Sequence, residues 1–121
     1  MRCLIVDDSP EFLDAASYLL QQEGLVVAGV AANGDDAVRR ARELRPDVTL
    51  VDIDLGDEDG LAVAQRLSEV PGHGAGTVIL ISTHDGDEFA ESIEASPAAG
   101  FIPKSTLSAE AVRRLVQRNP A

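Results

Sequence analysis

Short apolar runs alternate with amphipathic segments along almost the whole chain. The runs are continuously apolar, which is typical of strands buried on both faces of a sheet. Between them, apolar positions recur at helical spacing and predict helices. Five such strand–helix units predict one parallel sheet with helices on both faces. The predicted strands cover residues 2–6, 25–31, 47–53, 77–82 and 99–102, and the predicted helices lie within 9–24, 33–46, 59–70, 86–95 and 107–118.

The first predicted helix carries recognisable start and stop signals. Ser9 is a suitable N-cap, Pro10 takes the first helical position, and Gly24 follows the end. No linker, repeat or low-complexity segment interrupts the series, so we expect one doubly wound α/β domain over residues 1–121. The apolar stripe of this helix is predicted to consist of Phe12, Ala15, Ala16, Leu19 and Leu20.

Composition restricts the environment and the partners of the chain. The formal net charge is −11, so this domain is not expected to bind nucleic acid or anionic lipid directly. A cation, or a partner with a basic face, suits it better. Cys3 is the single cysteine, which excludes a disulfide framework and fits a cytoplasmic location. No apolar run approaches the roughly 18 residues of a membrane span, and the start is a poor signal peptide.

Polar side chains follow the predicted strands at one end of the sheet. Asp7 and Asp8 follow the first strand, Asp52 lies at the end of the third, Ser82 ends the fourth, and Lys104 follows the fifth. Ligand sites of such sheets lie beyond the carboxyl ends of the strands. Carboxylate oxygens at such a place suit Mg²⁺. Lys104 is the only lysine beside nine arginines, which suggests a position that needs a compact ammonium.

Four segments together resemble the landmark segments of response-regulator receiver domains. They are "LIVDDSP" (4–10), "PDVTLVDIDLGDEDG" (46–60), "VILIST" (78–83) and "GFIPKS" (100–105), in the family's order and spacing. The resemblance implies the flavodoxin-like strand order 2-1-3-4-5. "GLVVAGVAANGDDAV" (24–38) with "GFIPKSTL" (100–107) is particularly similar to the branch that carries a helix-turn-helix output domain.

The resemblance also implies a role for each acid of the cluster. Asp52 matches the phosphoacceptor, which takes a phosphoryl group from a phosphohistidine on a sensor histidine kinase. Asp7 and Asp8 match the acidic pair that holds Mg²⁺, with Asp8 as the direct ligand and Asp7 acting through water. Asp52 and the backbone carbonyl of Asp54 complete the implied ligand set. The three acids at 57–59 are expected to form a solvated turn and a helix start.

Three further positions match the parts of the family's switch. Lys104 matches the lysine that pairs with the phosphoryl group, Ser82 the hydroxyl that bonds it, and Phe101 the aromatic side chain that moves inward afterwards.

The chain departs from the common pattern at Gly56, where many receivers have proline, and at Thr83, where alanine is frequent. Gly56 is expected to loosen the loop. Thr83, together with Asp54 and His84, is expected to affect rates and phosphoryl lifetime, while His73 is expected to be solvated.

The function expected from the resemblance is a phosphorylation-controlled signalling switch, which catalyses only its own phosphorylation and dephosphorylation. Its expected partners are the kinase and either a DNA-binding output domain or a separate effector, and a phosphorylation-dependent homodimer is left open. The "DID" at 52–54 offers an enzyme alternative, a small phosphatase of the haloacid dehalogenase type. That family, however, carries its acid pair after the first strand. A degenerate receiver that acts by partner binding alone is the third alternative.

Overall fold

A five-stranded parallel sheet forms the centre of the computed structural model, which describes residues 1–83 and 89–118. The strands lie in the order β2-β1-β3-β6-β7. Counted along the chain, β6 and β7 are the fourth and fifth strands of this sheet, so the order is 2-1-3-4-5 and confirms the flavodoxin-like arrangement. The crossing from β1 outward to β2 and then back to β3 places β1 and β3 side by side. The strands are β1 Arg2–Val6, β2 Val26–Ala31, β3 Val48–Asp52, β6 Thr77–Ser82 and β7 Gly100–Pro103.

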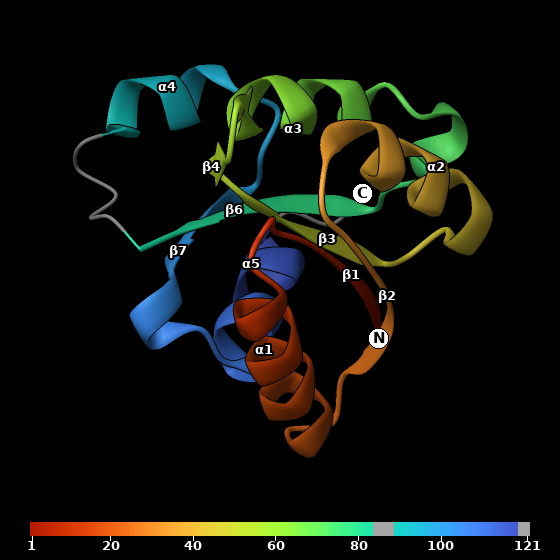
Figure 1. Ribbon diagram of the computed structural model, residues 1–121, viewed down its shortest axis with the longest axis vertical. Coiled ribbons are helices and arrows are strands. Elements are labelled where there is room, and N and C mark those ends of the chain that lie inside the picture. Colours follow the sequence, from red (N-terminus) through yellow and green to blue (C-terminus); the bar gives the residue numbers. More distant parts are fainter. Residues whose placement is uncertain (84–88, 119–121) are drawn as a thin grey trace.

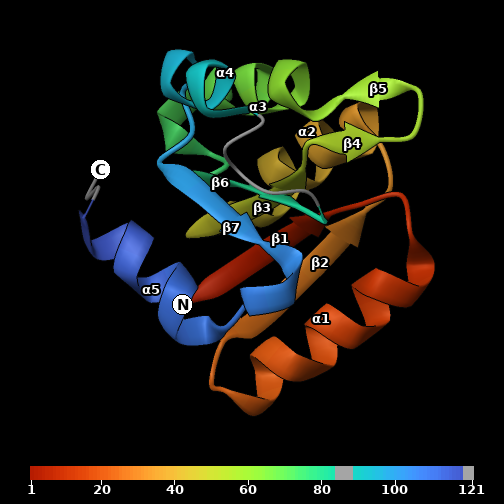
Figure 2. The same ribbon diagram turned by 90° about the vertical axis from the view of Figure 1, so that its left-hand side faces the viewer.

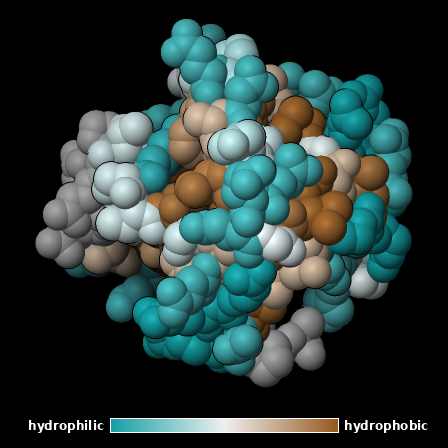
Figure 3. All heavy atoms as spheres, turned by 90° about the horizontal axis from the view of Figure 1, so that it is seen from below, coloured by the Kyte–Doolittle hydropathy of each residue, from teal (hydrophilic) through white to brown (hydrophobic). Residues whose placement is uncertain are grey.

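Helices cover both faces of this sheet. α1 (Pro10–Gln22) and α5 (Ala109–Arg118) lie on one face, and α2 (Gly34–Leu44), α3 (Gly60–Ser68) and α4 (Ala90–Ala95) lie on the other (Figure 1). Alternate residues of β1 show the two cores: Cys3 and Ile5 belong to the first face, whereas Leu4 and Val6 belong to the second. Seen from the α1 and α5 side, hydrophobic patches lie on both sides of a central hydrophilic strip, and hydrophilic residues surround them (Figure 3).

The start of α1 is as predicted, but its buried stripe is rotated. Ser9 Oγ accepts a hydrogen bond from the Phe12 amide at 3.3 Å, and Pro10 is the first helical residue. The helix buries Leu13, Ala16 and Leu20, which follow one another at three and four residues. The predicted members Ala15 and Leu19 are exposed, because the side of α1 that faces the sheet is the one that carries Leu13, Ala16 and Leu20.

Several boundaries differ from the predicted ones. α3 begins at Gly60 rather than residue 59, because Asp59 is its N-cap and accepts a hydrogen bond from the Leu61 amide at 2.9 Å. A short 3-10 helix, Lys104–Thr106, precedes α5, which begins at Ala109 rather than residue 107. Residues 86–88 of the predicted fourth helix, and His84, lie outside the described residues. No helix in the described part of the chain is long and apolar enough to cross a membrane.

A small hairpin that the sequence pattern did not predict follows β3. β4 (Asp54–Leu55) pairs antiparallel with β5 (Glu58–Asp59), so that Gly56 and Asp57 form a two-residue turn. Gly56 has a φ of 61°, and a glycine with positive φ at the first turn position is typical of type II′ hairpins. Proline could not occupy this position, because its φ is fixed near −65°. Gly56 therefore lies in a paired hairpin, and the expectation that it loosens this segment stays a prediction.

Candidate functional site

Four predicted site residues meet at the carboxyl ends of neighbouring strands. Asp7 directly follows β1, Asp52 ends β3, Ser82 ends β6, and Lys104 directly follows β7. Register brings the last three together, because Asp52 lies opposite Ile81 and Ser82 lies opposite Pro103. Asp7 and Ser82 are fully buried, and Asp52 is 5% exposed. Buried polar side chains at the end of an otherwise apolar sheet are costly, so their partners decide what the site can do.

Lys104 is the positive centre of this group. Its Nζ lies 2.6 Å from Asp7 Oδ2 and 3.1 Å from Asp52 Oδ2, and its side chain is only 13% exposed. The same Nζ lies 4.1 Å from the centre of the Phe12 ring, a cation–π distance. Burial by itself lowers the pKa of Lys104, but the contacts with Asp7 and Asp52 outweigh it and leave the pKa above its ordinary value. The side chain is therefore an ammonium shared by two carboxylates.

The Asp52 carboxyl is held from two sides. Oδ1 accepts a hydrogen bond from the Asp54 amide at 3.0 Å, and Oδ2 accepts one from Lys104. Burial raises the pKa of Asp52 to about 6, and the charge of Asp7 adds to this, whereas the Asp54 amide and Lys104 act in the opposite direction. Near neutral pH the group is mostly ionised and only partly compensated. An additional cation would therefore stabilise the ionised form of this carboxylate.

This raised pKa makes stability depend on pH in a definite direction. In the unfolded chain Asp52 ionises near its ordinary pKa of 3.8, so between about pH 4 and 6 only the folded form keeps the proton. In metal-free buffer, the penalty from Asp52 should be absent below pH 4, grow through this window, and stay constant above it. Its upper limit is about 3 kcal/mol. Denaturant unfolding of the wild type and Asp52→Asn from pH 4 to 8 isolates it, and a pH-independent difference between the two would contradict the assignment.

Asp8 extends the acidic group toward solvent. One carboxylate oxygen from each of Asp7, Asp8 and Asp52 lies within 4.8 Å of the others, and Asp8 is the exposed member. The Ser9 amide donates to Asp7 Oδ1 at 2.8 Å and fixes its orientation. An all-oxygen donor set of this kind fits a hard divalent cation such as Mg²⁺, which binds through few carboxylates and retains water. The residues present therefore suit the metal that the sequence predicted.

The remaining predicted residues differ in how near they lie to this centre. The Asp54 side chain is exposed, while its amide contacts Asp52. Thr83 is exposed beside Ser82. Phe101 lies opposite Leu80 in the sheet and is half-buried, with one side against the α2–α4 core. It also lines a surface groove of about 250 Å³ between β7 and α5, together with Leu115. The structure thus separates Phe101 from the acids and places it at the surface edge of the sheet.

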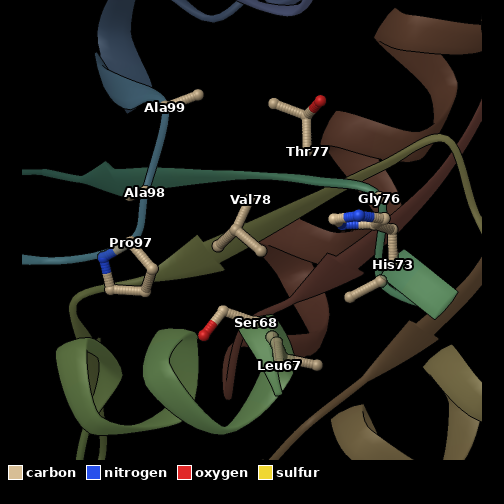
Figure 4. A pocket seen from close by; sticks show the side chains of 10 residues that line it. Leu67, Ser68, His73, Gly76, Thr77, Val78, Pro97, Ala98 and Ala99 are labelled. Carbon is tan, nitrogen blue, oxygen red and sulfur yellow. The ribbon is translucent and has the colours of Figure 1, made fainter. Parts of the chain in front are cut away.

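A hollow larger than this groove lies at the opposite end of the sheet, in the described part of the chain. A cavity of about 340 Å³ is bordered by the end of α3, the 71–76 loop and residues 97–99 (Figure 4). His73 lines it and is exposed, as the sequence indicated for this side chain. None of the predicted site residues contributes to this cavity. The charged chemistry and the concave surface are therefore separate features.

Sequence reasoning missed the contacts of two residues near the site. Phe12, assigned only to the apolar stripe of α1, covers the Lys104 ammonium. Glu58, expected to be solvated, is half-buried, and its Oε1 accepts a hydrogen bond from the Gly34 amide at 2.9 Å. Nothing in the spacing of either residue signals these contacts, since both depend on how a helix packs against a strand end.

Residues 3–117 match the family described as "Response regulator receiver domain". The chain belongs to this family. The match covers both the acidic group and Lys104, and it agrees with the five-stranded fold. The sequence resemblance to receivers of two-component systems is thereby confirmed.

Curated relatives with different names match this chain over part of their length. The protein-glutamate methylesterase/protein-glutamine glutaminase of Alkalilimnicola ehrlichii is 37% identical over 108 residues, which cover 86% of this chain and 27% of that protein. The response regulator GacA of Pseudomonas viridiflava is 30% identical over 116 residues, which cover 95% of this chain and 53% of that protein. The chain therefore spans between about a quarter and half of these relatives.

Solved structures agree with the fold. A two-component response regulator of the LuxR family from Aurantimonas sp. SI85-9A1 has a TM-score of 0.82 at 27% identity, over 97% of this chain and 83% of that one. The signal receiver domain of a modulated diguanylate cyclase from Desulfovibrio desulfuricans G20 has a TM-score of 0.77 at 31% identity, over 97% and 90%. Proteins with different names thus share this fold.

Proposed function

We propose that the chain is a phosphorylation-controlled signalling switch in which Asp52 accepts a phosphoryl group from a phosphohistidine on a sensor histidine kinase. One observation carries the proposal: the buried Asp52 carboxylate lies between an ammonium at 3.1 Å and two further carboxylates. An ordinary structural ion pair needs one acid for one base. Here one lysine contacts two acids, and an oxygen of a third acid lies within 4.8 Å of both, which is the arrangement of a site that handles additional charge.

Transfer to Asp52 is a simple substitution at phosphorus. An Asp52 oxygen forms the new bond to phosphorus as the bond between phosphorus and the imidazole nitrogen of the donor breaks, and the pair of electrons leaves with that nitrogen. The Asp54 amide holds Oδ1 and so orients the attacking group. Lys104, already within contact of Oδ2, is placed to neutralise charge on the phosphoryl oxygens. The chain's own residues thus mainly supply position and charge.

Asp7, Asp8, Asp52 and the backbone carbonyl of Asp54 would hold Mg²⁺. When bound, the ion supplies the positive charge that lets an anionic carboxylate meet an anionic donor. Asp7 is buried and oriented by the Ser9 amide, whereas Asp8 is exposed at the entrance. This division suits a fixed inner acid and an outer acid that is open to solvent.

The readout of phosphorylation is assigned to the β6–β7 side of the sheet. In this proposal the Ser82 hydroxyl bonds the phosphoryl group, Phe101 moves inward, and the surface around α4 and α5 changes. The residue range 1–121 is a single receiver domain of a cytoplasmic protein. Its output is an attached DNA-binding domain or a separate effector, and a phosphorylation-dependent homodimer is compatible with the position of β7 at the edge of the sheet.

Neither alternative gains support from the site. The haloacid dehalogenase type of phosphatase requires its acid pair after the first strand, but Asp52 ends β3, and residues 3–117 match the receiver family. A degenerate receiver has no use for an ammonium within 3.1 Å of the acceptor. We therefore favour the phosphorylated switch, which has no turnover on other substrates.

Phosphoramidate tests the proposal, because its P–N bond resembles that of phosphohistidine. The wild-type chain should gain one phosphate by intact mass in the presence of Mg²⁺ and none in EDTA. A phosphatase of the rival type would instead release product continuously from a simple phosphate ester. Metal-independent labelling, or ester turnover without a phosphorylated chain, would contradict the proposed function.

A further inference from the structure

The β4–β5 hairpin forms one wall of the acidic group. It begins two residues after Asp52, and the amide of its first residue, Asp54, donates to Asp52 Oδ1. At its turn, a Cβ atom on Gly56 would lie 3.0 Å from Asp8 Oδ2, so the backbone there approaches the Asp8 carboxylate closely. At its base, the Gly60 amide donates to the Ile53 carbonyl at 2.7 Å. The position of this hairpin therefore sets the space beside two of the three acids.

Two side chains fasten the hairpin to the rest of the domain. Leu55 of β4 is 3% exposed and belongs to the α2–α4 core. Opposite it in register, Glu58 of β5 accepts the hydrogen bond from the Gly34 amide at the first residue of α2. Two-stranded hairpins this short have little stability of their own. The apolar contact of one strand and the polar contact of the other must therefore hold it in place.

The contact of Glu58 also resolves an electrostatic problem. Asp54, Asp57 and Asp59 belong to the same segment, and Asp8 lies beside its turn, so like charges repel the hairpin from the acidic group. The amino end of α2 carries a partial positive charge that favours a carboxylate. Figure 2 shows β4 and β5 in the region of α2, beyond the arrowhead ends of β1 and β2. Glu58 is thus an acid of this segment whose carboxylate attaches the hairpin to α2.

We propose that Glu58 is a positioning residue for the divalent-cation site: by binding the Gly34 amide it holds the hairpin, with the Asp54 and Gly56 backbone, against Asp8 and Asp52. This rests on the proposed function, because it concerns the same cation. Glu58 does not contact the cation in this assignment. Its effect passes through the backbone of residues 54–56.

Replacement of Glu58 provides the test, with Mg²⁺ binding to the unphosphorylated chain measured by titration calorimetry at constant ionic strength. Glu58→Ala should bind Mg²⁺ about tenfold more weakly than wild type, in the range found for groups that orient metal ligands. Glu58→Gln removes the same charge but keeps an oxygen acceptor. It should remain within about threefold of wild type, since a neutral acceptor keeps a weaker version of the bond.

Glu23→Ala is the matched control. Glu23 Oε1 accepts a hydrogen bond at 2.8 Å from the amide of Ala109, the first residue of α5. It is the same kind of contact on another helix, at the far end of α1. Both Ala variants should lower the melting temperature by a few degrees, but Glu23→Ala should leave Mg²⁺ affinity unchanged. In amide spectra without metal, the Asp54 and Gly56 signals should move in Glu58→Ala and stay in place in Glu23→Ala.

Gly34→Ala approaches the same contact from its other side. A Cβ at Gly34 would lie 2.6 Å from Glu58 Oε2 and 2.9 Å from Arg66 Nη1, so it should push the carboxylate away. Mg²⁺ affinity should fall as in Glu58→Ala even though alanine favours a helix. The double variant should lose no more than either single one, because both remove one contact.

The outcomes separate the two proposals. If wild type binds Mg²⁺ and Glu58→Ala binds it equally well, the positioning role is wrong and the switch stands. If Glu58→Gln is as weak as Glu58→Ala, charge rather than the Gly34 hydrogen bond is responsible, and the positioning role is again wrong. If the wild type does not bind Mg²⁺, the cation site of the proposed function fails, and the role of Glu58 fails with it.

Discussion

Asp52→Asn should carry no phosphate after incubation with phosphoramidate and Mg²⁺, whereas wild type should carry one. The amide of asparagine keeps the shape of the side chain and can still accept from the Asp54 amide, but it is not a carboxylate nucleophile. Asp7 cannot substitute for it, because it is fully buried and its oxygens are engaged by the Ser9 amide and Lys104. Intact mass measures the result for both chains.

Asp57→Asn is the matched control for this loss. Asp57 lies exposed at the hairpin turn, five residues from Asp52, so it tests whether any nearby acid accepts the group. This variant should be phosphorylated like the wild type. Reduction of the aspartyl phosphate to a stable alcohol, followed by peptide mass analysis, should mark Asp52 alone. A full phosphate on Asp52→Asn would remove the basis of the proposed function.

Lys104→Met should destabilise the metal-free fold by about 3 kcal/mol, the cost of breaking a buried ion pair by removing one partner. Methionine fills a similar volume and can still pack on Phe12, so the loss is chiefly electrostatic. Asp7 and Asp52 would then face each other without the ammonium that both contact. Denaturant unfolding in EDTA measures the change, and added Mg²⁺ should restore part of it, because the cation replaces the missing positive charge.

Arg114→Met shows how much of this depends on burial. Arg114 pairs with Glu110 at 2.7 Å, a distance close to that between Lys104 and Asp7, but both side chains are more than 70% exposed. Exposed pairs of this kind contribute roughly 0.2–1 kcal/mol. The control should therefore unfold almost like the wild type. Equal losses in the two variants would show that Lys104 is an ordinary surface partner.

The sheet and the centre of the site could be predicted because they follow from strand ends. Continuous apolar runs located all five strands of the central sheet, and the residues just after them had to meet once the strands were parallel and adjacent. Asp7, Asp52 and Lys104 are brought together in this way. The strand order itself came from the resemblance to the receiver family, since periodicity alone does not specify which strands are neighbours.

The details that escaped prediction depend on packing between elements. The two-residue strands β4 and β5 are too short to show a period, and the acids around their turn suggested solvation rather than pairing. The orientation of α1 decides that Leu13 is buried and Ala15 exposed. It also brings Phe12 to Lys104. Such contacts are set by helix rotation, for which the sequence offers several nearly equivalent apolar stripes.

The edge position of β7 gives the site an unequal mechanical foundation. Asp7 and Asp52 extend from β1 and β3, which have hydrogen-bonded neighbours on both sides, while Lys104 extends from a four-residue strand with one neighbour. Proteins open locally where burial and pairing are least, so amide exchange should be faster in β7 than in β1 or β3. Fluctuation of this one strand would withdraw the ammonium and leave the acids in place. The contact between Lys104 and Asp52 should therefore be as stable as the pairing of β7, the shortest strand of the central sheet.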